Sequence, residues 1–263
     1  VAGLRRVVGA VRGVGWVAGG GGGVLGVGGR GRGGGGGGSR GNGVIGLFHG
    51  PSGTGKTLAA EAIATRLRMP LLAVDLSLVV SKYIGETEKN LARVFNAAEG
   101  FAALLFFDEA DALFGKRTGV QDAHDRYANI EVNYLLQRLE AFEGLALLST
   151  NLLQGMDEAF LRRFDQLVAF RRPGTAERRL IWQGHLPRDQ LDADVNVPEL
   201  AHLFEMSGGE IRNAALSAAY AAAAAGEPIN RAHLWQAIRR EYTKSGSPMP
   251  DSSLFLSFLP STP

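Results

Sequence analysis

The residues best suited to chemistry lie in a glycine-rich stretch that ends in Lys56 and Thr57. The stretch fits the pattern G-x-x-x-x-G-K-[ST], in which glycines let backbone N–H groups turn toward phosphate oxygens. We expect Lys56 to reach the β- and γ-phosphates of ATP and Thr57 to bind Mg²⁺. The predicted nucleotide-binding residues are Gly50, Pro51, Ser52, Gly53, Thr54, Gly55, Lys56, Thr57 and Leu58.

A pair of acids, Asp108 and Glu109, follows the apolar run 104–107. Ligands of parallel sheets sit at the carboxyl ends of the strands, which is where this pair would lie. Asp108 is predicted to hold Mg²⁺ through water, and Glu109 to act as the general base that polarises an attacking water. The string 108–111 also spells the signature of DEAD-box helicases, but no other motif of that family is present.

These residues need a scaffold of buried strands and crossover helices, and the sequence from Val44 onward supplies the pattern. Short apolar runs alternate with helical periodicity, which predicts an α/β fold with a parallel sheet and flanking helices. The predicted strands are Val44–His49, Leu71–Leu76, Ala102–Phe107, Leu145–Ser149 and Gln166–Phe170. After Pro173 and Gly174 the pattern is helical only, which predicts a small all-helical second domain.

Glycine and arginine dominate the first 43 residues, which hold 21 of the 37 glycines and six arginines but no acid. We expect this segment to be disordered, because it gains nothing from burial. Setting those arginines aside turns the formal charge of +2 into −4, which argues against nucleic-acid binding by the folded part. The predicted domains are 1–43 (disordered), 44–172 (nucleotide-binding), 173–243 (helical) and 244–263 (tail).

The chain contains no cysteine, which excludes disulfides and cysteine metal sites and favours a cytoplasmic location. The 45% apolar content is sufficient for a packed core. No apolar run approaches the ~20 residues that a membrane span requires.

Taken together, the two motifs and the segments that follow them resemble the AAA+ ATPases from about Val44 to Tyr242. The resemblance implies a P-loop NTPase sheet followed by a helical lid, with ATP and Mg²⁺ as cofactors. It also implies that Asn151, after the apolar run 145–148, is the polar residue called sensor 1. Arg162 and Arg163 match the arginine-finger segment, which in a ring would reach the neighbour's γ-phosphate. The usual Pro-Gly between two such arginines is absent, so which one is the finger stays open.

Three further segments fit the same family. Arg212, in the stretch 207–213, matches the sensor 2 region of the lid, where it would reach the nucleotide; a surface position with no such role is the alternative. The loop Lys82, Tyr83, Ile84 and Gly85 resembles the first pore loop of members that thread proteins, and 114–125 occupies the position of the second. His124 lacks a partner at metal-ligand spacing, so no metal site is expected there. The stretch 122–131 is similar to AAA+ ATPases encoded with phage-tail-like contractile injection systems.

The resemblance implies a ring, expected to be a hexamer of identical subunits, that uses ATP hydrolysis to remodel or thread a protein substrate. One departure stands against full activity: the segment that usually precedes the first strand and encloses adenine is replaced by the glycine tract. A nucleotide-binding assembly module with little turnover is therefore the alternative. A DNA-directed loader is disfavoured by the acidic core, and a P-loop kinase by the order of the sensor, finger and lid motifs.

Overall fold

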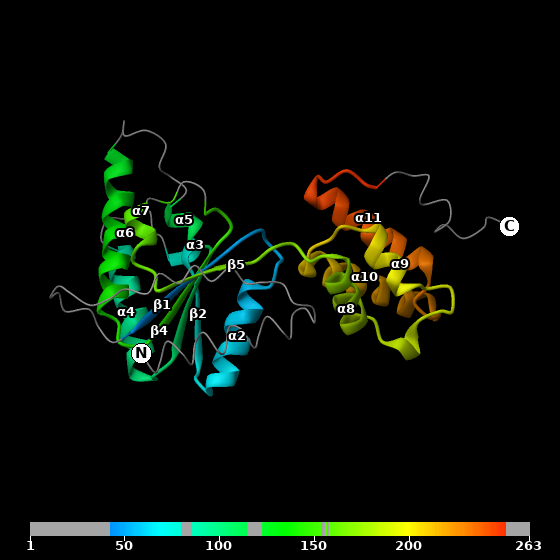
Figure 1. Cartoon of the computed structure of the whole chain (residues 1–263), viewed down its shortest axis with the longest axis horizontal. Helices are drawn as coiled ribbons and strands as arrows, with labels where there is room; N and C mark the ends of the chain where they lie inside the picture. Colours follow the sequence, from blue (N-terminus) through cyan, green and yellow to red (C-terminus); the bar gives the residue numbers. More distant parts are fainter. Residues whose placement is uncertain (1–42, 80–85, 115–122, 154–155, 157, 251–263) are drawn as a thin grey trace. The chain divides into compact units, whose positions relative to one another are not determined.

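The computed structural model describes residues 43–79, 86–114, 123–153, 156 and 158–250. Its described part forms two compact units, drawn in Figure 1. Of these residues, the α/β unit contains 43–51 and those from Lys56 to Phe170, and the helical unit contains Ser52–Gly55 and those from Arg171 to Pro250. The segment 1–42 lies outside the described residues, so its predicted disorder stays a prediction.

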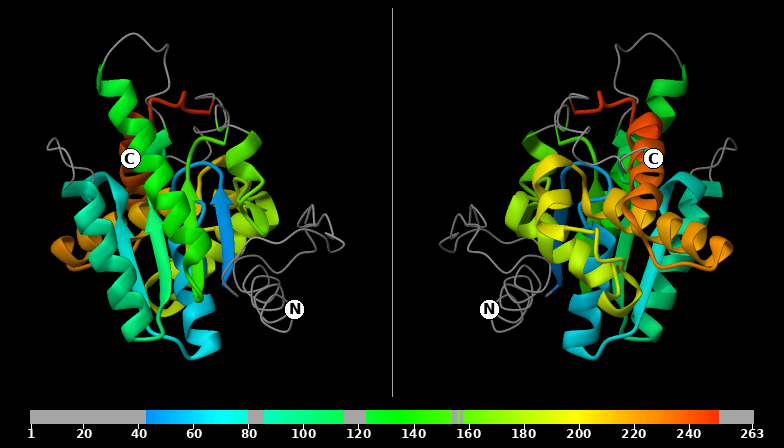
Figure 2. Two further views of the ribbon diagram at one scale, coloured as in Figure 1. Left: turned by 90° about the vertical axis from the view of Figure 1, so that its left-hand side faces the viewer. Right: turned by 90° about the vertical axis from the view of Figure 1, so that its right-hand side faces the viewer.

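The α/β unit is built on a five-stranded parallel sheet with the order β2-β3-β4-β1-β5 (Figures 1 and 2). Its strands are β1 (Val44–His49), β2 (Leu71–Asp75), β3 (Leu104–Asp108), β4 (Leu145–Thr150) and β5 (Gln166–Ala169). Its helices are α2 (Lys56–Leu67), α3 (Leu76–Val79), α4 (Glu86–Gly100), α5 (Asp111–Phe114), α6 (Ala123–Ala141) and α7 (Glu158–Leu161). The predicted parallel sheet with flanking helices is confirmed.

Both faces of the sheet are covered, and the residues of β3 divide between them. Leu104 and Phe106 pack in the cluster that contains the buried side of α2, whereas Leu105 and Phe107 pack with α4 and α6. Successive strand residues point to opposite faces, so a strand buried on both sides must be apolar throughout. This requirement explains why the strands are recognisable in the sequence as continuous apolar runs.

Five predicted strand ends were wrong, two of them for a clear local reason. The strands predicted to end at Phe107 and Ser149 extend to Asp108 and Thr150, and the strand predicted to end at Phe170 ends at Ala169. The strand predicted to begin at Ala102 begins at Leu104, because Ala102 takes a positive φ of 48° and cannot continue a strand. The strand predicted to end at Leu76 ends at Asp75. The Asp75 carboxylate accepts hydrogen bonds from the backbone N–H of Ser77 at 2.8 Å and from its hydroxyl at 2.6 Å, so the chain turns into α3 there.

The helical unit consists of helices packed around one apolar core. Its elements are α8 (Thr175–His185), the 3₁₀ turn η1 (Arg188–Gln190), α9 (Val197–Leu203), α10 (Gly208–Ala225) and α11 (Arg231–Ser245). Small residues of α10, including Ala214 and Ala218, are fully buried against this core. The predicted all-helical region is confirmed.

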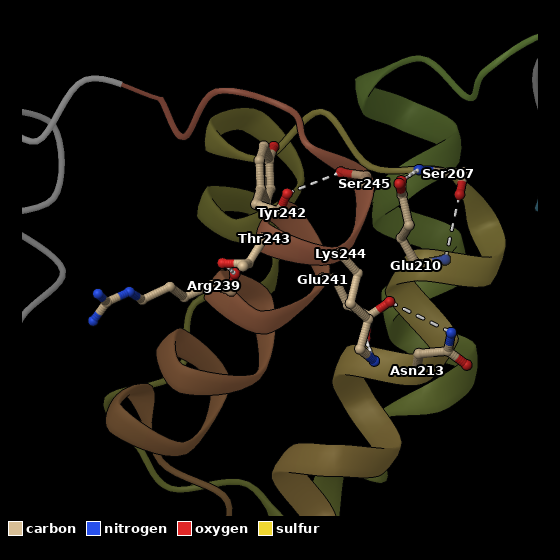
Figure 3. Close-up of polar contacts among 9 residues, drawn as sticks. All are labelled: Ser207, Glu210, Asn213, Arg239, Glu241, Tyr242, Thr243, Lys244 and Ser245. Atoms are coloured by element: carbon tan, nitrogen blue, oxygen red, sulfur yellow. Dashed lines mark hydrogen bonds and ion pairs between the residues drawn. The ribbon is translucent and has the colours of Figure 1, made fainter.

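Polar contacts fix the ends of α10 and α11 (Figure 3). Ser207 and Glu210 form a capping box, in which Ser207 N donates to Glu210 Oε2 at 2.6 Å and Glu210 N to Ser207 Oγ at 3.3 Å. Glu241 on α11 is buried and contacts Lys244 Nζ at 2.6 Å and Asn213 Nδ2 at 3.5 Å. These contacts satisfy a carboxylate that would otherwise be costly to bury.

Arg178 on α8 is the buried cation of the helical unit, with 7% of its surface exposed. Its guanidinium donates to Ala201 O and Pro173 O, both at 2.9 Å, and to Thr175 Oγ1 at 3.2 Å. One side chain thus joins α8 to α9 and to the chain that enters the unit.

We expect Arg178→Met to destabilise the protein by roughly 2–4 kcal/mol, because buried carbonyl groups lose a charged donor. Arg179→Met is the matched control, since Arg179 is the exposed neighbour on the same helix and its replacement should cost less than about 0.5 kcal/mol. Urea denaturation followed by circular dichroism measures both values. Equal stability of the two variants would contradict a structural role for the guanidinium.

Among the described residues, no helix has both the length and the apolar character needed to cross a membrane.

Candidate functional site

Three of the predicted site residues, Lys56, Asp108 and Asn151, lie where β1, β3 and β4 end. The three strands are parallel neighbours, with His49 paired to Thr150 and Phe107 paired to Leu148. Their carboxyl ends therefore lie at one edge of the sheet, which is the ligand-binding edge of such folds. Lys56, Asp108 and Asn151 all come from the segments that leave this edge.

Glycine is required where the phosphate-binding loop leaves β1. Gly50 has a φ of 142°, and a Cβ at this position would lie 1.9 Å from the carbonyl oxygen of Phe170. Gly55 has a φ of 95°, and a Cβ there would meet no described atom within 4 Å. The first glycine thus permits close packing of two backbones, and the second permits a conformation that side chains rarely adopt.

The tip of the loop, Ser52–Gly55, groups with the helical unit. Within that unit, Gly209 N donates to Gly53 O at 2.9 Å. Leu58, in the first turn of α2, keeps 63% of its surface exposed.

Lys56 is buried to 7% exposure, and its ammonium group is fully hydrogen-bonded. Nζ donates to Gly50 O at 2.7 Å, Asn151 Oδ1 at 2.9 Å and Pro51 O at 3.0 Å. Burial lowers the pKa of Lys56, while the charges of Asp108 and Asp111 act in the opposite direction. A lysine held in this way can neutralise phosphate charge with little loss of side-chain entropy.

His49, the last residue of β1, is affected by the same lysine. Burial lowers the pKa of His49, and the nearby Lys56 cation lowers it further. The imidazole is therefore neutral near pH 7 and leaves Lys56 as the cation at the start of the loop.

An oxygen cluster suited to Mg²⁺ surrounds Asp108. Thr57 Oγ1 donates to Asp108 Oδ2 at 2.8 Å, while Glu109 N at 3.0 Å and the Ser149 hydroxyl donate to Oδ1. No group of three or more His, Cys, Asp or Glu that could hold a metal occurs in the described segments. The pair Thr57 and Asp108 nevertheless fits Mg²⁺, which keeps several waters and takes few ligands from protein beside substrate phosphates.

Glu109 is exposed and has a positive φ of 54°, in the left-handed region. A side-chain-bearing residue is rare there and costs conformational energy. The turn holds because Ala112 N donates to Glu109 O at 2.9 Å and Ala110 N donates to Ser149 O at 2.8 Å. The side chain of Glu109 is therefore exposed directly after Asp108, and its role as general base stays a prediction.

Two residues of the site were not given a role from the sequence: Ser149 and Asp111. Ser149 is buried and orients the Asp108 carboxylate, whereas Asp111 contacts the end of β4. A signal for Ser149 was available, because a serine that ends an apolar strand beside a strand ending in Asp can reach across. Asp111 carries no comparable signal, because it does not end a strand but begins α5, after the turn that follows β3.

The two arginines of the predicted finger segment form ion pairs within the α/β unit. Arg162 NH2 lies 2.7 Å from Glu158 Oε1, one turn back, with 63% of the arginine side chain exposed. Arg163 NH1 lies 3.1 Å from Glu140 Oε1 on α6, with 36% exposed. Arg163 is thus tied to a second helix, whereas Arg162 remains at the surface.

Arg212 lies in the first turns of α10 and is exposed. In the same unit, burial lowers the pKa of His185 and the Arg212 charge lowers it further. The predicted first pore loop (Lys82, Tyr83, Ile84 and Gly85) lies outside the described residues, as does 115–122 of the second. His124 falls within α6, but its side chain is not among those described.

Comparison with known proteins agrees with this geometry. Residues 46–172 match the family described as "ATPase family associated with various cellular activities (AAA)". The chain belongs to the AAA family of ATPases. Residues 174–242 match the contractile injection system ATPase helical domain, which confirms the predicted resemblance to that group.

Several relatives share this AAA domain. The chain is 34% identical to cell division protein C of Sulfolobus acidocaldarius, over 60% of this chain and 45% of the relative. It is 32% identical to the proteasome-activating nucleotidase of Sulfurisphaera tokodaii, over 76% of this chain and 53% of the relative. It is 34% identical to the ATP-dependent zinc metalloprotease FtsH 3 of Sphaerobacter thermophilus, over 74% of this chain and 41% of the relative. The chain thus spans about half the length of these relatives.

The contact between Ser149 and Asp108 yields a prediction about metal dependence. In Ser149→Ala the Asp108 carboxylate loses a donor, so the Mg²⁺ concentration for half-maximal ATPase activity should rise about tenfold. Thr65→Ala is the control, because Thr65 Oγ1 donates at 2.9 Å to Glu61 O of its own helix. A Mg²⁺ titration of ATP hydrolysis measures both, and an unchanged midpoint in Ser149→Ala would exclude this orienting role.

Proposed function

We propose that this AAA protein hydrolyses Mg·ATP and uses the energy to remodel, unfold or disassemble a protein substrate. The observation that carries the proposal is the meeting of Lys56, Asp108, Glu109 and Asn151 at the carboxyl edge of the sheet. Each group is placed for a different task in phosphoryl transfer. A site of this completeness is more than nucleotide binding alone requires.

In the proposed reaction Lys56 neutralises charge on the transferring phosphate. Thr57 and Asp108 would hold Mg²⁺, which would supply further charge neutralisation at the phosphates. Glu109 accepts a proton from the attacking water, and Asn151 orients that water. The carboxamide of Asn151 contacts Lys56 at 2.9 Å, so the two groups sit close enough to act on one phosphate.

Remodelling of protein is supported by the kind of relatives that share the domain, which include a proteasome-activating nucleotidase and an FtsH protease. The helical-domain match favours a role beside a contractile injection system. The aromatic loop around Tyr83 is proposed to grip the substrate, because a large ring offers contact area without demanding one side chain.

We further propose that the active form is a ring, a hexamer of identical subunits. The finger segment supports this, because Arg162 lies 2.7 Å from Glu158 of its own helix and keeps 63% of its side chain exposed, where a neighbouring subunit could reach it. A guanidinium supplied by a neighbour stabilises transition-state charge with a large effect on rate.

Glu109→Gln is the direct test of hydrolysis. The variant should bind ATP within about threefold of the original affinity but hydrolyse it at least about 100-fold more slowly, because only the base is lost. Glu99→Gln makes the same change at an exposed position of α4, and this variant should hydrolyse ATP at the original rate. Phosphate release and binding of a fluorescent ATP analogue measure the two properties. An unaltered protein that binds ATP without turnover would instead support the assembly-module alternative.

Mixing of variants tests the ring. Arg162→Ala subunits mixed with Glu109→Gln subunits should regain turnover that neither has alone, since an intact arginine then faces an intact base across an interface. Arg162 is preferred because 63% of its side chain is exposed, against 36% for Arg163, and Arg163→Ala is tested in parallel. Arg93→Ala, an exposed change on α4, should behave as the original protein. A rate that is independent of protein concentration, with no recovery in either mixture, would contradict assembly.

A further inference from the structure

Asp111 stands two residues after Glu109, at the first position of α5. The turn that carries it is attached to β4, because Ala110 N donates to Ser149 O at 2.8 Å. The side chain of Asp111 is therefore held beside the strand end that leads to Asn151. None of the tasks assigned above to Lys56, Asp108 or Glu109 uses this carboxylate.

The carboxylate of Asp111 meets the end of β4 at two points. Its Oδ1 atom accepts from Asn151 N at 3.2 Å and lies 3.4 Å from the hydroxyl of Thr150. Thr150 is fully buried, and its single hydroxyl proton can reach either Asp111 or the carbonyl of Leu152 at 3.2 Å. The carboxylate is the stronger acceptor because it is charged.

The turn after β4 that carries Asn151 depends on the same hydroxyl. Leu152 N donates to Thr150 Oγ1 at 3.1 Å, so the hydroxyl that faces Asp111 also shapes the turn around Asn151. At the other end of the same residue, Asn151 Oδ1 accepts from Lys56 Nζ at 2.9 Å. A continuous path of contacts thus runs from Asp111 through Asn151 to Lys56.

We propose that Asp111 is a positioning residue for ATP hydrolysis, which holds the backbone of Asn151 so that its carboxamide stays aligned with the phosphates. The inference rests on the proposed ATPase function. Asp111 acts through Asn151 and does not itself contact the reacting atoms.

The test is a double-mutant cycle between Asp111 and Asn151. Asp111→Ala should lower kcat about tenfold, the size expected for loss of hydrogen bonds to a charged group, with KM for ATP changed less than about threefold. Asp111→Asn keeps an oxygen that can accept from Asn151 N and should retain more than about one third of kcat. In the Asn151→Ala background, Asp111→Ala should lower kcat by less than about twofold, because the group through which it acts is gone.

Glu177→Gln is the control for loss of a carboxylate that accepts from backbone, since Glu177 Oε2 accepts from Gly174 N at 2.8 Å in the helical unit. It should leave kcat unchanged.

If Asp111→Ala melts without cooperativity, the cycle is run with Thr150→Val, which removes the hydroxyl side of the contact and keeps the side-chain shape. Its kcat should again fall in the original background and not in Asn151→Ala.

Two results would overturn the inference while leaving the ATPase function intact: an unaltered kcat in folded Asp111→Ala, or an equal loss in both backgrounds. An original protein that hydrolyses no ATP at any concentration would instead remove the proposed function, and the inference with it.

Discussion

The site depends on one constraint: a lysine ammonium buried at the end of a parallel sheet must be surrounded by acceptors. Lys56 meets it with two loop carbonyls and one carboxamide, all within 3.0 Å. Those partners come from the loop after β1 and from the segment after β4. The carboxyl ends of both strands must therefore lie side by side at the same edge of the sheet. The adjacent position of β1 and β4 in the sheet, in parallel register, provides this. Burial of one charge thus ties the local conformation of the loop to the order of the strands.

Much of this arrangement could be predicted from the sequence because the forces involved are local or strongly patterned. The strand Val44–His49 was predicted with its correct bounds, since both of its faces are apolar and a glycine-rich turn follows. Glu109 and Asp108 could be placed because a strand end has a known relation to the ligand edge of a sheet. Asn151 was assigned as sensor 1 by resemblance, and the structure places its carboxamide in contact with Lys56.

The remainder could not be predicted because it depends on contacts between distant parts of the chain. Arg178 looks like an ordinary surface arginine of an amphipathic helix, and its burial becomes apparent only once Ala201 O is brought beside it. The left-handed turn at Ala102 follows from how α4 is joined to β3, and no glycine or asparagine marks it. Asp111 and Thr150 are common residue types whose meeting requires the final sheet order.

The backbone conformation of Glu109 lowers the conformational stability of the fold. A residue with a Cβ in the left-handed region gives up about 1–2 kcal/mol relative to ordinary backbone, and glycine would recover most of it. The chain nevertheless carries a glutamate at this point, directly after the acid that orients it. In the proposed mechanism, position 109 is therefore a place where conformational stability is exchanged for reactivity, and selection for thermal stability alone would favour the loss of Glu109.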